Sequence, residues 1–246
     1  MKFNFNEMRK FYSLVFIFAF VSFGFCQDND TIVKFTSAIR VNLSKFKNHQ
    51  QIALDHKEPE KAKILFDSLV HQQVKGSYFD FFSVRKVHGG RVRFKRLKKP
   101  VVMFTHTDWL VKNKGELQAI NKLAREYRKS VTFLFIYWNN KEGAKKASKK
   151  LNSNIISCFA DEDYKYDFRM VKMMRNTLGF PTTYQMNEHG IIRNVEQGIG
   201  KFIPLHVPLK KAKDDNYNYL KDKLQHTLQY ADSLANLKPK RRFLFF

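Results

Sequence analysis

Cysteine is scarce in this chain. Only two occur among 246 residues, Cys26 and Cys158. Cys26 follows an apolar N-terminal segment, so Cys158 is the one cysteine expected in a processed protein. A single cysteine cannot form an intramolecular disulfide, and the fold must therefore be held by its core. Dithiol exchange needs a second thiol close to the first, which this sequence does not supply.

Several other patterns that carry enzymatic chemistry are also missing. The sequence contains no Gly-x-Ser-x-Gly, no phosphate loop and no paired-carboxylate pattern. His106 and Asp108 lie close together, but metal sites usually need three or four ligands at recognisable spacing. The acidic segment 161–163 lacks the glycine and ligand periodicity of a calcium loop. The sequence predicts no metal and no cofactor, and it favours a polar loop with a helix cap at His106 and Asp108.

The chain has no apolar run of the ~20 residues that a membrane-spanning helix usually needs. Its longest such run, Phe11 to Phe25, follows Lys2, Arg9 and Lys10. A basic start followed by a short apolar stretch is typical of a secretory signal peptide. We therefore expect residues 1–26 to be a signal peptide and the protein to be periplasmic or otherwise associated with the cell envelope. Lipid anchoring at Cys26 is the less favoured alternative, because Phe25 is bulky where such sites favour small residues.

Acidic residues are few: 45 Lys and Arg face 22 Asp and Glu, a formal net charge of +23. Such an excess draws a protein toward anionic surfaces through an attraction that salt weakens. In the run 91–99, basic residues alternate with apolar ones, as in a strand with one solvent-exposed face. Nucleic-acid binding is therefore not favoured. The tail 237–246 is basic and then aromatic, which is typical of segments that dock on a membrane surface or a partner.

The remaining sequence predicts an α/β domain over residues 76–236, preceded by an appendage over 27–75. In the appendage, period-two spacing predicts a strand over Val33–Leu43, and Pro59 begins a helix that ends at Gly76. In the domain, strand–helix–strand order is the signature of an α/β sheet. The expected strands are 78–87, 92–97, 101–104, 131–138, 155–159, 181–186 and 191–195, and the expected helices are 116–129, 141–150 and 214–234.

The order of these landmarks resembles the thioredoxin-like redoxins of bacterial envelopes, the thiol–disulfide reductase and peroxidase-related group. The strand that runs into Trp109 resembles the strand before the family's Cys-x-x-Cys corner. The segment 179–184, with Phe180, Pro181 and Thr182, resembles the facing cis-proline loop. The helix at 141–150 resembles the insertion that distinguishes these redoxins from plain thioredoxin. The resemblance implies a thioredoxin-like fold with an N-terminal hairpin and an inserted helix.

The resemblance fails at the reacting atoms. Aligning Trp109 with the family's tryptophan places Leu110 and Asn113 on the two cysteine positions, and no cysteine lies between 27 and 157. The family's chemistry needs a thiolate whose pKa is lowered at a helix N-terminus. Cys158 lies in an apolar run that predicts a strand, where cysteines are usually inert and buried.

The sequence therefore predicts an exported thioredoxin-fold protein without a dithiol site, retained as a binding module for a protein or peptide in the envelope. The resemblance implies an apolar groove lined by Trp109, Leu110, Asn113, Phe180, Pro181 and Thr182. Two alternatives stay open: a single-cysteine redox protein that uses Cys158, and a basic protein that binds an envelope polyanion or membrane surface.

Overall fold

A computed structural model describes residues 33–107, 110, 113–161, 165, 168–179 and 181–235. The predicted signal peptide 1–26 and the tail 237–246 lie outside this part of the chain. Within the described residues, no helix combines the length and the apolar character needed to cross a membrane.

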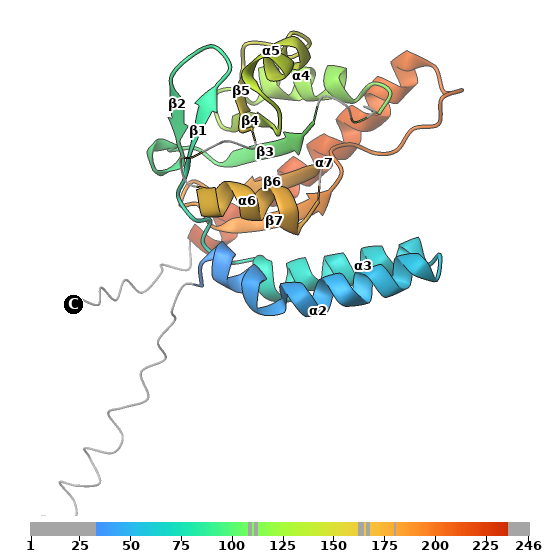
Figure 1. The fold of residues 1–246 in the computed structure, drawn as a ribbon. Coiled ribbons are helices and arrows are strands. Elements are labelled where there is room, and N and C mark those ends of the chain that lie inside the picture. Colours follow the sequence, from blue (N-terminus) through green and yellow to red (C-terminus); the bar gives the residue numbers. More distant parts are fainter. Residues whose placement is uncertain are drawn as a thin grey trace, which may run out of the picture. The chain divides into compact units, whose positions relative to one another are not determined.

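A seven-stranded mixed sheet forms the centre of the fold, in the order β2-β1-β5-β4-β3-β6-β7 (Figure 1). The neighbours β3, β4 and β5 run parallel, and the other pairs run antiparallel. This arrangement confirms the predicted thioredoxin-like α/β class with its N-terminal hairpin, formed by β1 and β2. The strands are β1 Ser83–Lys86, β2 Arg91–Arg93, β3 Val101–His106, β4 Thr132–Tyr137, β5 Ile155–Phe159, β6 Thr182–Met186 and β7 Ile192–Gln197.

Helices cover both faces of the sheet. The predicted helices over 116–129, 141–150 and 214–234 are confirmed as α4, α5 and α7, and the helix that begins at Pro59 is α3, followed by a π-helical segment at Val70–Val74. The helices are α2 Phe35–Asp55, α3 Pro59–Leu69, α4 Glu116–Glu126, α5 Lys141–Ser148, α6 Phe168–Thr177 and α7 Leu209–Ala235.

The central strand β3 divides the core into two layers, and every one of its side chains is buried. Val102 and Phe104 belong to the cluster that contains residues of α4, α5 and α7. Val101 and Met103 belong to the cluster that contains residues of α2, α3 and α6. Successive side chains of a strand point to opposite faces, so β3 packs against both helical layers at once. Its end, where the predicted site begins, is therefore fixed from both sides.

The predicted strand over Val33–Leu43 is wrong, because this segment belongs to helix α2. The buried side chains Phe35, Ala38, Ile39 and Phe46 recur at helical spacing, whereas Val41 is 81% exposed. The period of two that predicted a strand was a coincidence of a few apolar positions. Burial of one helical face against α3 and against Tyr184 of β6 decides the conformation.

The first hairpin is shorter than predicted, and one helix was not predicted. Tyr78 forms only isolated bridges, to Lys34 and Ile191, so the strand begins at Ser83 rather than at Tyr78. After β2, Phe94–Arg96 forms a 3-10 turn instead of continuing the strand. Helix α6 lies between β5 and β6, where the sequence analysis predicted no element.

Asp80 caps the first turn of α2 across the fold. Its two carboxylate oxygens accept hydrogen bonds from the backbone N–H and the hydroxyl of Thr36, each at 2.9 Å. Lys34, the N-cap residue, provides no side-chain cap of its own. Because the first N–H groups of a helix lack intrahelical partners, Asp80 satisfies a donor that would otherwise depend on water.

We expect Asp80→Ala to lower the free energy of unfolding by about 1–2 kcal/mol, measured by urea denaturation. Amide exchange in the first turn of α2 should accelerate as well. Asp67→Ala is the matched control, because its ion pair with Lys63 at 3.0 Å is exposed and such pairs contribute at most about 0.5 kcal/mol. Equal losses in the two variants would contradict the capping role.

Candidate functional site

The predicted site lies where β3 ends and β6 begins. Of the residues predicted to line it, Leu110, Asn113, Pro181 and Thr182 are described, whereas Trp109 and Phe180 lie outside the described residues. The strands that carry these two segments are neighbours, because Thr105 near the end of β3 is the register partner of Thr182 in β6. The aromatic lining of the predicted groove stays a prediction.

Thr182 is held by hydrogen bonds inside the protein. Its N–H donates to Thr105 Oγ1 at 3.1 Å, and the Thr105 hydroxyl donates to the Thr182 carbonyl at 3.2 Å. Its own hydroxyl donates to the carbonyl of Gly179 at 2.7 Å, and the residue is fully buried. Next to it, the Pro181 carbonyl accepts from Gly198 N–H at 2.7 Å. The start of β6 is thus fixed in place, and Thr182 positions the backbone instead of presenting its hydroxyl to a ligand.

On the other side of the site, helix α4 begins at Glu116, after the N-cap residue Gly115. The Asn113 side-chain amide donates to the Glu116 carboxylate at 3.1 Å, and Glu116 is buried. A negative charge in the first turn interacts favourably with the helix dipole. Leu110 is half-buried and precedes the N-cap by more than one helical turn. At the two positions aligned with the family's cysteines, the chain therefore has an apolar side chain and an amide bonded to a carboxylate.

Asn216, buried in α7, joins three segments around this site. Its amide group donates to the carbonyls of Lys114 at 3.0 Å and Ala212 at 3.2 Å, and its oxygen accepts from Lys201 N–H at 2.8 Å. Asn216 was not predicted as a site residue. The available signal is a polar, weak helix former within an otherwise regular helical pattern.

Close backbone approach completes this arrangement. Gly115 has φ +79°, and a Cβ atom there would lie 2.5 Å from the backbone nitrogen of Lys213. A Cβ atom at Gly200 would overlap the Asn216 side chain. Glycine is required at Gly115 both for its left-handed backbone and for the contact with α7. The β7–α7 loop, residues 198–208, is therefore fastened to the start of α4.

Cys158 lies on β5 and is fully buried within the cluster that contains residues of α2, α3 and α6. Burial raises the pKa of its thiol to about 12, a rise that the charge of Lys86 only partly offsets. At neutral pH the thiol stays protonated, and a protonated thiol is neither a nucleophile nor a metal ligand. The prediction that Cys158 is a buried strand cysteine is confirmed.

The described residues contain no group of three or more His, Cys, Asp or Glu that could hold a metal ion. His106 is buried at the end of β3, and its Nδ1 atom lies in close contact with the carbonyl of Thr107. Asp108 lies outside the described residues, so its predicted role as a helix cap stays a prediction.

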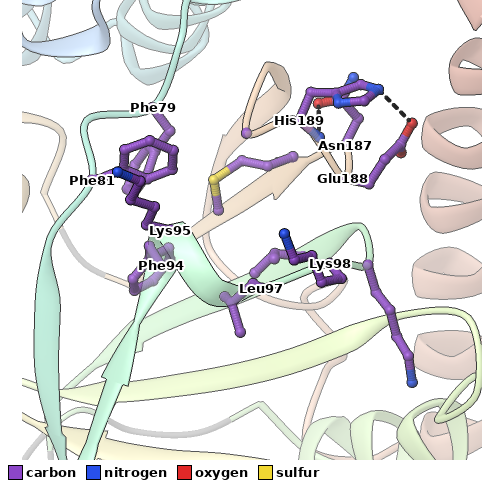
Figure 2. A pocket seen from close by; sticks show the side chains of 13 residues that line it. Phe79, Phe81, Phe94, Lys95, Leu97, Lys98, Asn187, Glu188 and His189 are labelled. Atoms are coloured by element: carbon purple, nitrogen blue, oxygen red, sulfur yellow. Dashed lines mark hydrogen bonds and ion pairs between the residues drawn. The ribbon is translucent and has the colours of Figure 1, made fainter.

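A separate pocket of about 350 Å³ lies at the opposite end of β3 (Figure 2). Val101 at the start of β3 and Met186 at the end of β6 line it, together with the turn that contains Glu188 and His189. Figure 2 shows the aromatic rings of Phe79, Phe81 and Phe94 on the far side of this pocket from His189. His189 Nε2 lies 3.3 Å from the Glu188 carboxylate. The pocket is therefore separate from the predicted groove, which lies beyond the other end of the strand.

No family model and no curated protein matches this chain. Solved structures do resemble it. The exposed lipoprotein thioredoxin Etrx1 of Streptococcus pneumoniae is 18% identical with a TM-score of 0.39, and the match covers 55% of this chain and 99% of that one.

A thiol:disulfide interchange protein from Bacteroides sp. is 18% identical with a TM-score of 0.42, over 51% of this chain and 82% of that one. A thiol-disulfide oxidoreductase from Bacteroides fragilis is also 18% identical, with a TM-score of 0.39, over 48% of this chain and 90% of that one. These similarities are low, so the thioredoxin-like assignment rests on the sheet order and connectivity observed in the chain itself.

Proposed function

We propose that this protein is an exported thioredoxin-fold binding module that recognises an extended peptide or protein segment in the cell envelope without exchanging thiols and disulfides. The observation that carries the proposal is the state of Cys158. It is the only cysteine after residue 26, it is fully buried, and its thiol has a pKa of about 12. A thiol in this state cannot begin disulfide exchange.

The rest of the site supports recognition. Hydrogen bonds of Thr182 and Pro181 hold the start of β6 in one conformation, and Asn216 joins the neighbouring loop to the residue before α4. Binding sites gain affinity when their backbone is already ordered before the ligand arrives. Leu110, half-buried at this end of the sheet, supplies an apolar contact. Extended segments are commonly bound by such surfaces through main-chain hydrogen bonds and side-chain pockets.

The test uses a library of short unstructured peptides selected on the full-length chain. We expect the affinity of the enriched peptides to fall about tenfold or more in Leu110→Asp, because a charge would replace a central apolar contact. Val41→Asp is the matched control, since Val41 is an exposed apolar residue on α2, a helix that contributes no residue to the predicted site. Its affinity should stay at the wild-type value.

Two results would overturn the proposal. The first is equal affinity of the enriched peptides for the wild-type chain and for Leu110→Asp. The second is catalytic reduction of insulin disulfides by the wild-type chain that disappears in Cys158→Ala, which would establish a single-cysteine redox protein instead.

A further inference from the structure

Three large apolar side chains are exposed within the β7–α7 loop and the first residue of α7. Phe202 is 77% exposed, Leu205 is 87% exposed and Leu209 is 51% exposed. Single exposed apolar residues are common on protein surfaces, but three within one short segment indicate a contact surface. Figure 1 shows this segment joining the end of β7 to the start of the long helix α7.

The loop is held in shape by contacts on its inner side. Ile203 is buried between the two exposed residues, and Lys201 N–H donates to buried Asn216. The Leu205 carbonyl accepts from Lys114 Nζ at 2.8 Å, and Val207 N–H closes a turn onto Pro204 at 3.1 Å. Because the inward contacts are satisfied, Phe202 and Leu205 stay in the solvent. The loop is therefore ordered in a conformation that presents these apolar side chains to another molecule or to a lipid surface.

The charge along this segment is positive up to the acidic pair Asp214 and Asp215 that follows it, and Lys213 lies 4.0 Å from the Asp214 carboxylate. From Gly198 to Lys213 the chain contains no acidic residue, and it contains four lysines. Lys201, Lys210 and Lys211 are exposed, and Lys213 is half-buried. Protein–protein interfaces are depleted in lysine, whereas segments that lie on anionic membranes combine lysines with Phe and Leu. Each lysine close to such a surface strengthens binding by about fivefold at moderate salt.

We propose that the β7–α7 loop and the first turn of α7 dock on an anionic lipid bilayer, with Phe202 and Leu205 inserted among the lipids and the lysines at the headgroups. Lys114 and Asn216 tie this loop to the start of α4. Docking would therefore hold the end of the sheet that carries Leu110 and Asn113 close to the membrane surface.

The experiment uses a probe on the loop itself, so that it distinguishes insertion of the loop from binding through the apolar N-terminal segment. In full-length protein carrying Cys26→Ser, His206→Cys is labelled with the polarity-sensitive fluorophore NBD, while buried Cys158 stays unlabelled. Vesicles of phosphatidylglycerol and phosphatidylcholine should raise the NBD emission and shift it to the blue. Val41→Cys on α2, labelled in the same way, is the control and should not respond.

A second pair of variants tests how much the lysine charges contribute to vesicle binding. Lys210→Ala with Lys211→Ala should weaken vesicle binding, followed by the response at residue 206, about 25-fold. Lys145→Ala with Lys146→Ala on α5 removes the same charge elsewhere and should change it little. An absent response at residue 206, a response equal to that at residue 41, or an equal response to neutral phosphatidylcholine vesicles would each overturn the proposal. A response to an acidic peptide such as polyglutamate, without one to vesicles, would assign the loop to a protein partner instead.

Discussion

The thiol of Cys158 is expected to react with a reagent such as DTNB at pH 8 roughly a thousandfold more slowly in the folded chain than in the chain unfolded in urea. A free cysteine has a pKa near ~8.5, so a sizeable share is thiolate at pH 8. With the pKa raised to about 12, the thiolate share falls by roughly a thousandfold. The measurement is the reaction rate in Cys26→Ser protein, where Cys158 is the only thiol.

The control places a thiol on the surface of the same protein. Val41→Cys should react in the folded state at the rate of an unfolded thiol, because residue 41 is 81% exposed. A fast reaction of folded Cys158 would show that β5 opens readily to solvent. It would also restore the single-cysteine alternative for the function.

The raised pKa of Cys158 has a consequence for stability, with a definite sign. Above about pH 8.5 the unfolded chain ionises this thiol, whereas the folded chain keeps it protonated up to a pH of about 12. The unfolded state then binds fewer protons, so the free energy of unfolding falls as the pH rises through this window. Cys158→Ala should show a shallower fall between pH 8 and 10, because other groups still titrate but this one is absent.

Replacing Gly115 by alanine is expected to lower the free energy of unfolding by about 3 kcal/mol or more. About 1 kcal/mol of this follows from the left-handed backbone at φ +79°, which alanine adopts poorly. The remainder follows from the overlap of the new methyl group with the backbone of Ala212 and Lys213, which cannot move as a flexible side chain would. The measurement is urea denaturation followed by circular dichroism.

Gly89→Ala separates the two causes. Gly89 has φ +94° in the hairpin turn, and an added Cβ there would meet nothing within 4 Å. The Gly89→Ala variant should lower the free energy of unfolding by only about 1 kcal/mol, because alanine adopts this backbone conformation poorly. If Gly115→Ala lowered the free energy of unfolding no more than Gly89→Ala does, the packing of α4 against α7 would be looser than the structure indicates.

The sequence predicted the domain well because its strands and helices carry strong local patterns. β5 matches its predicted bounds, and β4 was recognisable as an apolar run buried on both faces. Helix α2 was misread because Val33, Phe35, Ile39 and Val41 also fit a period of two. The burial of Phe35 against Phe79 and Tyr184, which decides the conformation, comes from residues far away in the sequence.

The candidate site could be predicted only in part, for a similar reason. The placement of Thr182 near the start of a strand was predicted from the sequence, and so was the burial of Cys158. The role of Asn216 could not, because its partners Lys114 and Lys201 belong to other segments, and a weak helix former within a helix does not show which groups it binds. The sequence also could not show which apolar residues of the loop are exposed. Phe202 is 77% exposed and its neighbour Ile203 only 5%, although both are strongly hydrophobic.

The packing of α2 also sets an order on events during synthesis of the chain. Phe35 lies edge-on to the ring of Tyr184, and Ile192 exchanges backbone hydrogen bonds with Gly76 and Ser77. A ribosome makes α2 and α3 long before it makes β6 and β7. The nascent helices α2 and α3 therefore lack their partners in β6, such as Tyr184 for Phe35, until that strand has been made. Until then they can associate with one another but not with their final neighbours, and the newly made protein depends on late strands to protect its earliest helices from aggregation.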